Sequence, residues 1–80
     1  GNTSNSKTSA EVFEFEVLPN AKVTKKPIKE LKFPRDAVFG GIIRDGKALM
    51  SFGDFQIRSG DKAIVFCLPE AIHIVEDLFR

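Results

Sequence analysis

The sequence predicts an α+β domain in which a mostly antiparallel β-sheet is covered by a C-terminal amphipathic helix. Three observations support this fold class. Phenylalanine and valine alternate with glutamate near the N-terminus, Asp-Gly and Gly-Asp pairs separate short apolar runs in the middle, and apolar residues recur with helical spacing near the end. Alternation with period two is typical of a half-buried strand, and Asp-Gly between apolar runs favours a tight hairpin. The expected element order is β-α-β-β-β-α.

The first strand is expected at residues 12–18. Phe13, Phe15 and Val17 fall on one face of this strand, and the two intervening glutamates fall on the other. One face is therefore predicted to be buried and the other to contact water. Pro19, followed by Asn20, ends the strand.

A short helix is expected at residues 27–31. Pro27 suits the first helical position, because its fixed φ matches the helix and it has no N–H to leave unpaired. Ile28 and Leu31 lie three residues apart and so share one face of that helix. Pro34 ends the element, since the residue before a proline is disfavoured in helical geometry.

Three further strands are expected at residues 38–43, 47–52 and 62–68. The pair Gly40-Gly41 marks a bulge or a close approach of two backbones in the first of these. The turn Asp45-Gly46 connects it to the next strand. Residues 62–68 are apolar on both faces, which predicts a central position in the sheet.

The last element is predicted to be an amphipathic helix that begins at Pro69. Proline favours the first turn of a helix, and a terminal arginine complements the helix macrodipole. One apolar stripe with helical spacing follows the proline and consists of Ala71, Ile72, Val75, Leu78 and Phe79.

Size and composition predict one small folded domain at residues 12–80. Residues 1–11 are polar and lack periodicity, which indicates a disordered leader or an interdomain linker. A core of this size provides little stability alone, and oligomerisation is a common remedy. No apolar run is long enough for a membrane span, and no signal peptide is recognisable.

The balance of charge argues against nucleic-acid binding. The chain has 12 basic and 11 acidic residues, with a formal net charge of +1. Neutralising several phosphates requires a dominant basic patch, and here the two signs are interspersed. The densest basic run, from Lys22 to Lys32, is interrupted by Glu30 and by apolar residues, so we expect a solvated face.

No pattern of residues predicts an enzyme or a metal site. His73 lies three residues after Glu70 and four before Asp77, a spacing that could formally hold a metal. Without a fourth ligand this trio is more often a solvated charged stripe. Cys67 lies in an apolar run and is expected to be a buried, unreactive thiol, and no nucleophile motif accompanies the one histidine.

The turn residues have clear structural roles. Gly46 and Gly60 fit positions that need a positive φ, and Asp45 and Asp61 can accept backbone N–H groups within their turns. Arg44 has two interpretations: a side chain paired with a nearby carboxylate or a partner, or an exposed arginine at a strand end. The exposed strand-end arginine is the expectation.

Two segments of the chain resemble a known family. Residues 41–46 (GIIRDG) followed by residues 59–66 (SGDKAIVF) are similar to the C-terminal domain of TrkA-type regulators of potassium transport, the TrkA_C or RCK_C family. The resemblance extends over residues 12–79. Ser51 stands where the family often has proline, and Lys25 where it commonly has glycine.

The resemblance implies a non-catalytic, cytoplasmic regulatory module that forms a homodimer. Through a longer protein, such a module acts on a potassium-translocating membrane subunit at the inner face of the cell membrane. The dimer interface is expected to use Val38, Phe39, Ile42 and Ile43. NAD or ATP is expected only in a neighbouring Rossmann-type domain, because the GxGxxG spacing is absent here, and no cofactor is assigned to this chain.

An alternative function is the sensing of a small ligand. Some relatives of this module bind a cyclic dinucleotide between two subunits, and others bind divalent cations. Here such a site would use backbone groups near Ile42, Ile43 and Arg44, together with His73. The guanidinium of Arg44 suits phosphate geometry and is the strongest single candidate.

Overall fold

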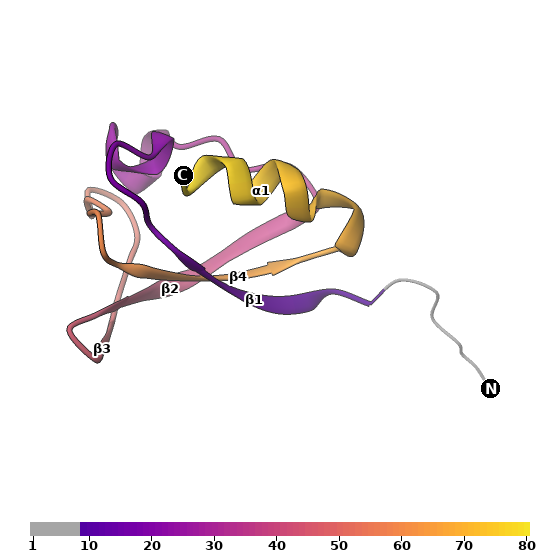
Figure 1. Ribbon diagram of the computed structural model, residues 1–80, viewed down its shortest axis with the longest axis horizontal. Helices are drawn as coiled ribbons and strands as arrows, with labels where there is room; N and C mark the ends of the chain where they lie inside the picture. Colours follow the sequence, from indigo (N-terminus) through magenta and orange to yellow (C-terminus); the bar gives the residue numbers. More distant parts are fainter. Residues whose placement is uncertain (1–8) are drawn as a thin grey trace.

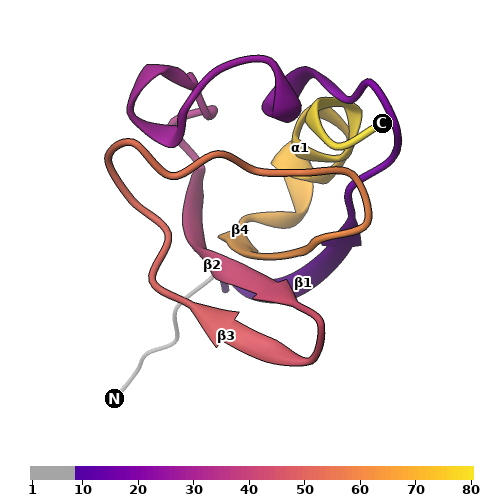
Figure 2. The same cartoon turned by 90° about the vertical axis from the view of Figure 1, so that its left-hand side faces the viewer.

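A four-stranded antiparallel sheet with one short helix on one face forms the domain (Figure 1, Figure 2). The computed structural model describes residues 9–80, and most of the predicted leader at 1–11 lies outside the described residues. The elements are β1 (Glu11–Glu16), β2 (Ala37–Arg44), β3 (Lys47–Leu49), β4 (Lys62–Cys67) and α1 (Ile72–Leu78). The strand order is β1-β4-β2-β3, with every pair antiparallel. The predicted α+β fold is confirmed, and so is the central position of β4.

Residues 9–80 also contain three single 3-10 turns: η1 (Lys22–Thr24), η2 (Ile28–Glu30) and η3 (Pro69–Ala71). The helix expected at residues 27–31 is reduced to η2. Pro27 precedes that turn in an extended conformation instead of opening it. The N–H groups of Ile28 and Lys29 donate to carbonyls at positions 55 and 53, which ties this segment to a distant loop. The turn ends at Leu31, whose ψ of 142° is extended and not helical.

The strand expected at residues 47–52 ends at Leu49, because Ser51 replaces the backbone in pairing with β2. Its hydroxyl accepts the N–H of Ile42 at 3.1 Å and donates to the carbonyl of Leu49 at 2.7 Å. One side chain therefore satisfies a donor that a longer β3 would have paired. Within residues 9–80, no helix has the length and apolar character needed to cross a membrane.

The hydrophobic core lies between the sheet and α1. Phe15 of β1 stacks on Phe79 with 5.3 Å between ring centroids and an interplanar angle of 3°. Cys67 is buried as expected, and burial, followed by the charge of Glu11, raises the pKa of its thiol. The fully buried apolar residues are Val17, Ala21, Val23, Ala37, Ile42, Ile57, Ala63, Val65, Cys67, Ala71, Val75 and Phe79.

A β-bulge at Gly40 and Gly41 sets which residues of β2 face the core. The register passes from Phe39 opposite Val65 to Gly41 opposite Ile64, so Gly40 is the extra residue. Gly41 has φ +152°, a conformation that residues with a Cβ rarely adopt. The bulge confirms the prediction from the glycine pair. Because Gly40 is an extra residue, the alternation between core-facing and outward-facing side chains shifts by one position after it, and Ile42 points into the core.

Candidate functional site

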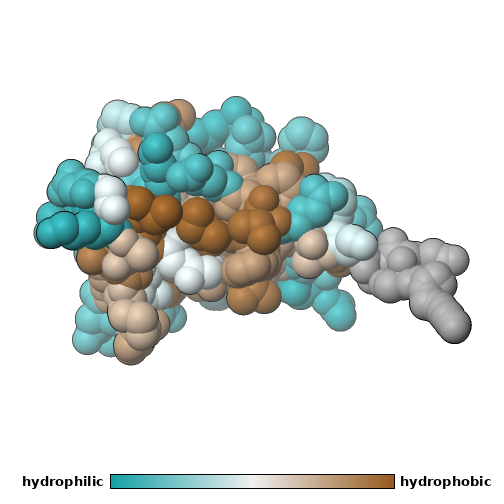
Figure 3. Space-filling model, turned by 90° about the horizontal axis from the view of Figure 1, so that it is seen from below, coloured by the Kyte–Doolittle hydropathy of each residue, from teal (hydrophilic) through white to brown (hydrophobic). Residues whose placement is uncertain are grey.

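The face of the sheet opposite α1, here called the outer face, exposes a row of apolar side chains. The register places Val12 beside Phe66 and Phe66 beside Val38, on three neighbouring strands. Their exposed fractions are 61%, 43% and 64%. Figure 3 views the molecule from this side and shows apolar residues gathered across the middle of the face. Contiguous exposed apolar surface of this kind marks interaction sites.

A groove of about 350 Å³ continues the outer face toward β3. Gly40 keeps it open beside Phe66: a Cβ at this glycine would lie 2.9 Å from a carbon of the Phe66 ring and 3.1 Å from the carbonyl oxygen of Ile64. The apolar lining also includes Ile43, Ala48, Met50 and Ile64. The glycine of the bulge therefore both shapes the groove and leaves room for the Phe66 ring beside it.

The four residues predicted for a dimer contact do not share one face. Val38 is exposed on the outer face, and Ile43 lines its groove. Ile42 is 1% exposed and belongs to the core. Phe39 stacks on Phe33 with 5.6 Å between ring centroids, also on the core side. Only the first two are positioned for contact with another molecule.

Sequence reasoning missed Val12 and Phe66, although the pattern contained both. Val12 belongs to the same alternating face as Glu14, which made that face look purely polar. Phe66 lies in an apolar run that predicts burial on both sides, yet its outer side has no covering layer. Assigning the single C-terminal helix to one face would have left the other face of β4 exposed.

Arg44 is not the exposed strand-end arginine that the sequence predicts. Its Nε and Nη2 donate to the two carboxylate oxygens of Asp61, each at 2.8 Å, and Nη2 also donates to the carbonyl of Gln56 at 3.0 Å. The guanidinium carbon lies 5.0 Å from the ring centroid of Phe55. Three of its five N–H groups are thus used inside the domain.

Asp61 is the buried member of this pair, with 2% of its surface exposed. Burial acts to raise the pKa of its carboxyl, but hydrogen bonds from Arg44 and from the backbone N–H of Arg58 outweigh that effect, so the pKa lies below its usual value. The pKa of Arg44 is raised, chiefly by its hydrogen bond to Asp61. Asp61 also confirms the prediction that it accepts an N–H within its turn, at 2.9 Å.

His73 lies apart from the other predicted ligand-binding residues. Its Nδ1 is 3.8 Å from Glu76 Oε1, and its side chain is exposed near the start of α1. That helix follows the end of β4 where Cys67 pairs with β2, whereas Arg44 lies at the opposite end of β2. Within one chain, His73 therefore does not form a common site with Ile42, Ile43 and Arg44. Nowhere in residues 9–80 do three His, Cys, Asp or Glu residues form a group that could hold a metal.

The chain is similar to a known domain family over almost all of its described length. The model of the TrkA-C domain matches residues 12–80. The Trk system potassium uptake protein TrkA homolog 2 of Methanosarcina mazei is 35% identical over 71 residues, which cover 89% of this chain. The corresponding TrkA homolog of Archaeoglobus fulgidus is 34% identical over 64 residues, 80% of this chain.

These relatives are much longer than this chain, which spans 16% and 15% of their lengths. The Trk system potassium uptake protein TrkA of Azorhizobium caulinodans, 28% identical over 90% of this chain, is likewise matched over 16% of its length. A solved structure described as an RCK domain with cda superposes with a TM-score of 0.71 and 25% identity. That alignment covers 86% of this chain and 97% of the solved one.

Proposed function

This chain belongs to the TrkA-C domain family, and from that membership we propose that it is a non-catalytic regulatory and dimerisation module of a potassium uptake protein. The curated relatives that carry the Trk potassium-uptake name support this proposal. In it, the module works in the cytoplasm as part of a longer protein that controls a potassium-translocating membrane subunit. NAD or ATP would bind a neighbouring Rossmann-type domain, and this module would hold no cofactor.

The observation that carries the dimer is the row formed by Val12, Phe66 and Val38 on the outer face. A two-fold axis through this face would place the row against its own copy, as isologous interfaces require. Phe66 lies at the centre of the row, where a buried aromatic contributes most to binding. A domain of this size also gains stability from covering an exposed apolar face.

Light scattering coupled to size exclusion tests the dimer. At high micromolar concentration we expect twice the mass of one chain. Val38→Asp places a charge on the outer face and should give a monomer, whereas Ile74→Asp should leave the dimer intact. Ile74 is a matched control because it is 59% exposed, close to the 64% of Val38, but lies on α1 away from the outer face. A monomeric unmodified chain, or equal effects of the two variants, would contradict the proposal.

A second candidate function is the sensing of a small effector. The solved relative described as an RCK domain with cda favours it, because this chain covers 97% of that domain. We propose that the effector contacts the region of Ile43 and Nη1 of Arg44, the guanidinium nitrogen that makes no hydrogen bond within residues 9–80. This region lies at the rim of the proposed dimer interface. His73 is exposed on the helix side of the sheet, so a dimer through the outer face would leave it outside such a site.

Calorimetric titration with cyclic di-AMP, ATP, ADP and Ca²⁺ tests the effector. Saturable heat with one of them would support the sensing function, and the stoichiometry would tell whether one ligand serves one chain or two. Absence of heat with all four would contradict it. The dimer measured by light scattering is independent of that result.

A further inference from the structure

The positive charge of the chain is concentrated in one segment on the helix side of the sheet. Six of its 12 basic residues lie between Lys22 and Arg35, and the one acidic residue among them is Glu30. The remaining sequence is therefore net negative. The basic side chains of this run are exposed to solvent, as the sequence predicts. Four of them nevertheless gather around one pocket.

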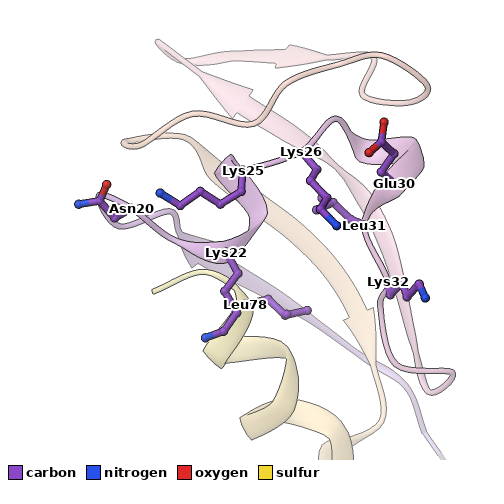
Figure 4. Close-up of a pocket in the computed structure, with 8 residues that line it drawn as sticks. All are labelled: Asn20, Lys22, Lys25, Lys26, Glu30, Leu31, Lys32 and Leu78. Carbon is purple, nitrogen blue, oxygen red and sulfur yellow. The ribbon is translucent and has the colours of Figure 1, made fainter.

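Four of these lysines surround a pocket of about 410 Å³, which lies between η1, the segment after η2 and the end of α1 (Figure 4). Leu31 and Leu78, both half-buried, supply apolar surface in the pocket. Four exposed lysines form the rim together with Asn20 and Glu30, namely Lys22, Lys25, Lys26 and Lys32. Figure 4 shows the Glu30 carboxylate pointing away from Lys22 and Lys25. The volume falls in the range of small-molecule sites.

None of the four rim lysines has a carboxylate partner among residues 9–80. Lys22 Nζ lies 3.4 Å from the carbonyl oxygen of Asp77 and covers the C-terminal end of α1. This contact is to a backbone carbonyl, so it leaves the charge of Lys22 without an ion pair, as for the other three. By contrast, Lys29 does not line the pocket and is paired with Asp54 at 2.7 Å. The domain thus leaves its positive charge uncompensated where the pocket is.

The backbone that carries the rim is held in place. Val23, between two rim positions, is buried in the core. Thr24 donates from both its N–H and its hydroxyl to the carbonyl of Ala21, at 2.9 and 2.7 Å. The side-chain amide of Gln56 donates to the carbonyl of Thr24 at 2.7 Å. A fixed backbone reduces the ordering that a ligand must impose, which favours binding.

From this geometry we propose that the pocket binds a small molecule that bears a phosphate or carboxylate on an apolar body. Exposed lysines alone hold an anion weakly, because salt screens charges beyond about 8 Å at physiological ionic strength. An apolar surface alone does not select for charge. The rim and the leucines together favour a ligand that has both properties, and the outer face takes no part in the site.

Amide chemical shifts of the 15N-labelled chain test the proposal, with 1-naphthyl phosphate as the probe. We expect saturable shifts confined to residues 20–32 and the end of α1. Neutral 1-naphthol and inorganic phosphate each carry one half of the recognition chemistry and should bind more weakly by about tenfold or more. The double variant Lys25→Ala/Lys26→Ala should weaken the probe by about tenfold, the effect of two surface charge interactions.

The control is Lys47→Ala/Lys62→Ala, which removes the same charge from exposed strand positions outside the pocket. It should leave the affinity within about twofold. Shifts centred on the outer face, equal effects of the two double variants, or no saturable shift would overturn the proposal. So would binding to vesicles that contain phosphatidylglycerol without any competition by 1-naphthyl phosphate, since that outcome assigns the lysines to a lipid surface.

Discussion

Arg44 and Asp61 form a bidentate ion pair that joins the end of β2 to the turn entering β4, 17 residues along the chain. The carboxylate of Asp61 also accepts the backbone N–H of Arg58, and its carbonyl accepts the N–H of Val17. One buried aspartate therefore connects the β2–β3 hairpin, the turn before β4 and the end of β1. The family-like turns Arg-Asp-Gly and Gly-Asp are coupled to one another through this pair.

Asp61→Asn is expected to lower the free energy of unfolding by about 2–4 kcal/mol, because it leaves the guanidinium of Arg44 without its charged partner. Urea denaturation measures the change. Asp54→Asn is the matched control, since Asp54 forms an exposed ion pair with Lys29. Its loss should change stability by less than about 1 kcal/mol. Similar losses of stability for the two variants would show that the buried Arg44–Asp61 pair contributes no more to stability than the exposed pair.

The same pair predicts how stability depends on pH. The pKa of Asp61 is lower in the folded chain than in the unfolded one, so its contribution is fully present above about pH 4, the ordinary carboxyl pKa. It is lost as pH falls below that value through the folded pKa. The stability difference between the unmodified chain and Asp61→Asn should therefore be constant from pH 7 to 5 and shrink below pH 4. A difference that does not shrink as pH falls below 4 would contradict this linkage.

Gly41→Ala is expected to destabilise the domain by about 1–3 kcal/mol, because φ +152° is strained for any residue with a Cβ. Gly46→Asn is the comparison: Gly46 has φ +76° in the hairpin turn, and asparagine tolerates left-handed geometry. This second change should cost less than about 1 kcal/mol. Thermal unfolding of the two variants ranks them, and a reversed order would mean that the bulge accommodates a side chain.

Ser51→Ala removes the acceptor of the Ile42 N–H at the end of β3. Leaving a half-buried N–H unpaired should cost about 1–3 kcal/mol. Hydrogen exchange reads this effect at one site: protection of the Ile42 amide should fall more than protection of the Ala63 amide in β4. Ser59→Ala, at an exposed turn position, should leave both amides unchanged.

The sequence predicts those elements whose residue pattern is local. It does not predict features that depend on contacts between segments far apart in the chain. The alternation of apolar and charged residues predicts β1, and the glycine pair predicts the bulge in β2. The side-chain role of Ser51 and the pairing of Arg44 with Asp61 depend on residues brought together only by the fold. The outer face shows the same limit, because placing Ile42 inward and Ile43 outward requires knowing that Gly40 is the extra residue.

If the outer face pairs with its own copy, thermal unfolding should depend on protein concentration, because dimer formation adds to the stability of the folded chain by mass action. The midpoint should rise between low and high micromolar concentration. Phe66→Ser removes the centre of the apolar row, whose ring is 43% exposed in the single chain. That variant should unfold at one temperature whatever its concentration. His73→Ser changes a side chain on α1 and should keep the concentration dependence, so equal behaviour of the two variants would place the interface elsewhere.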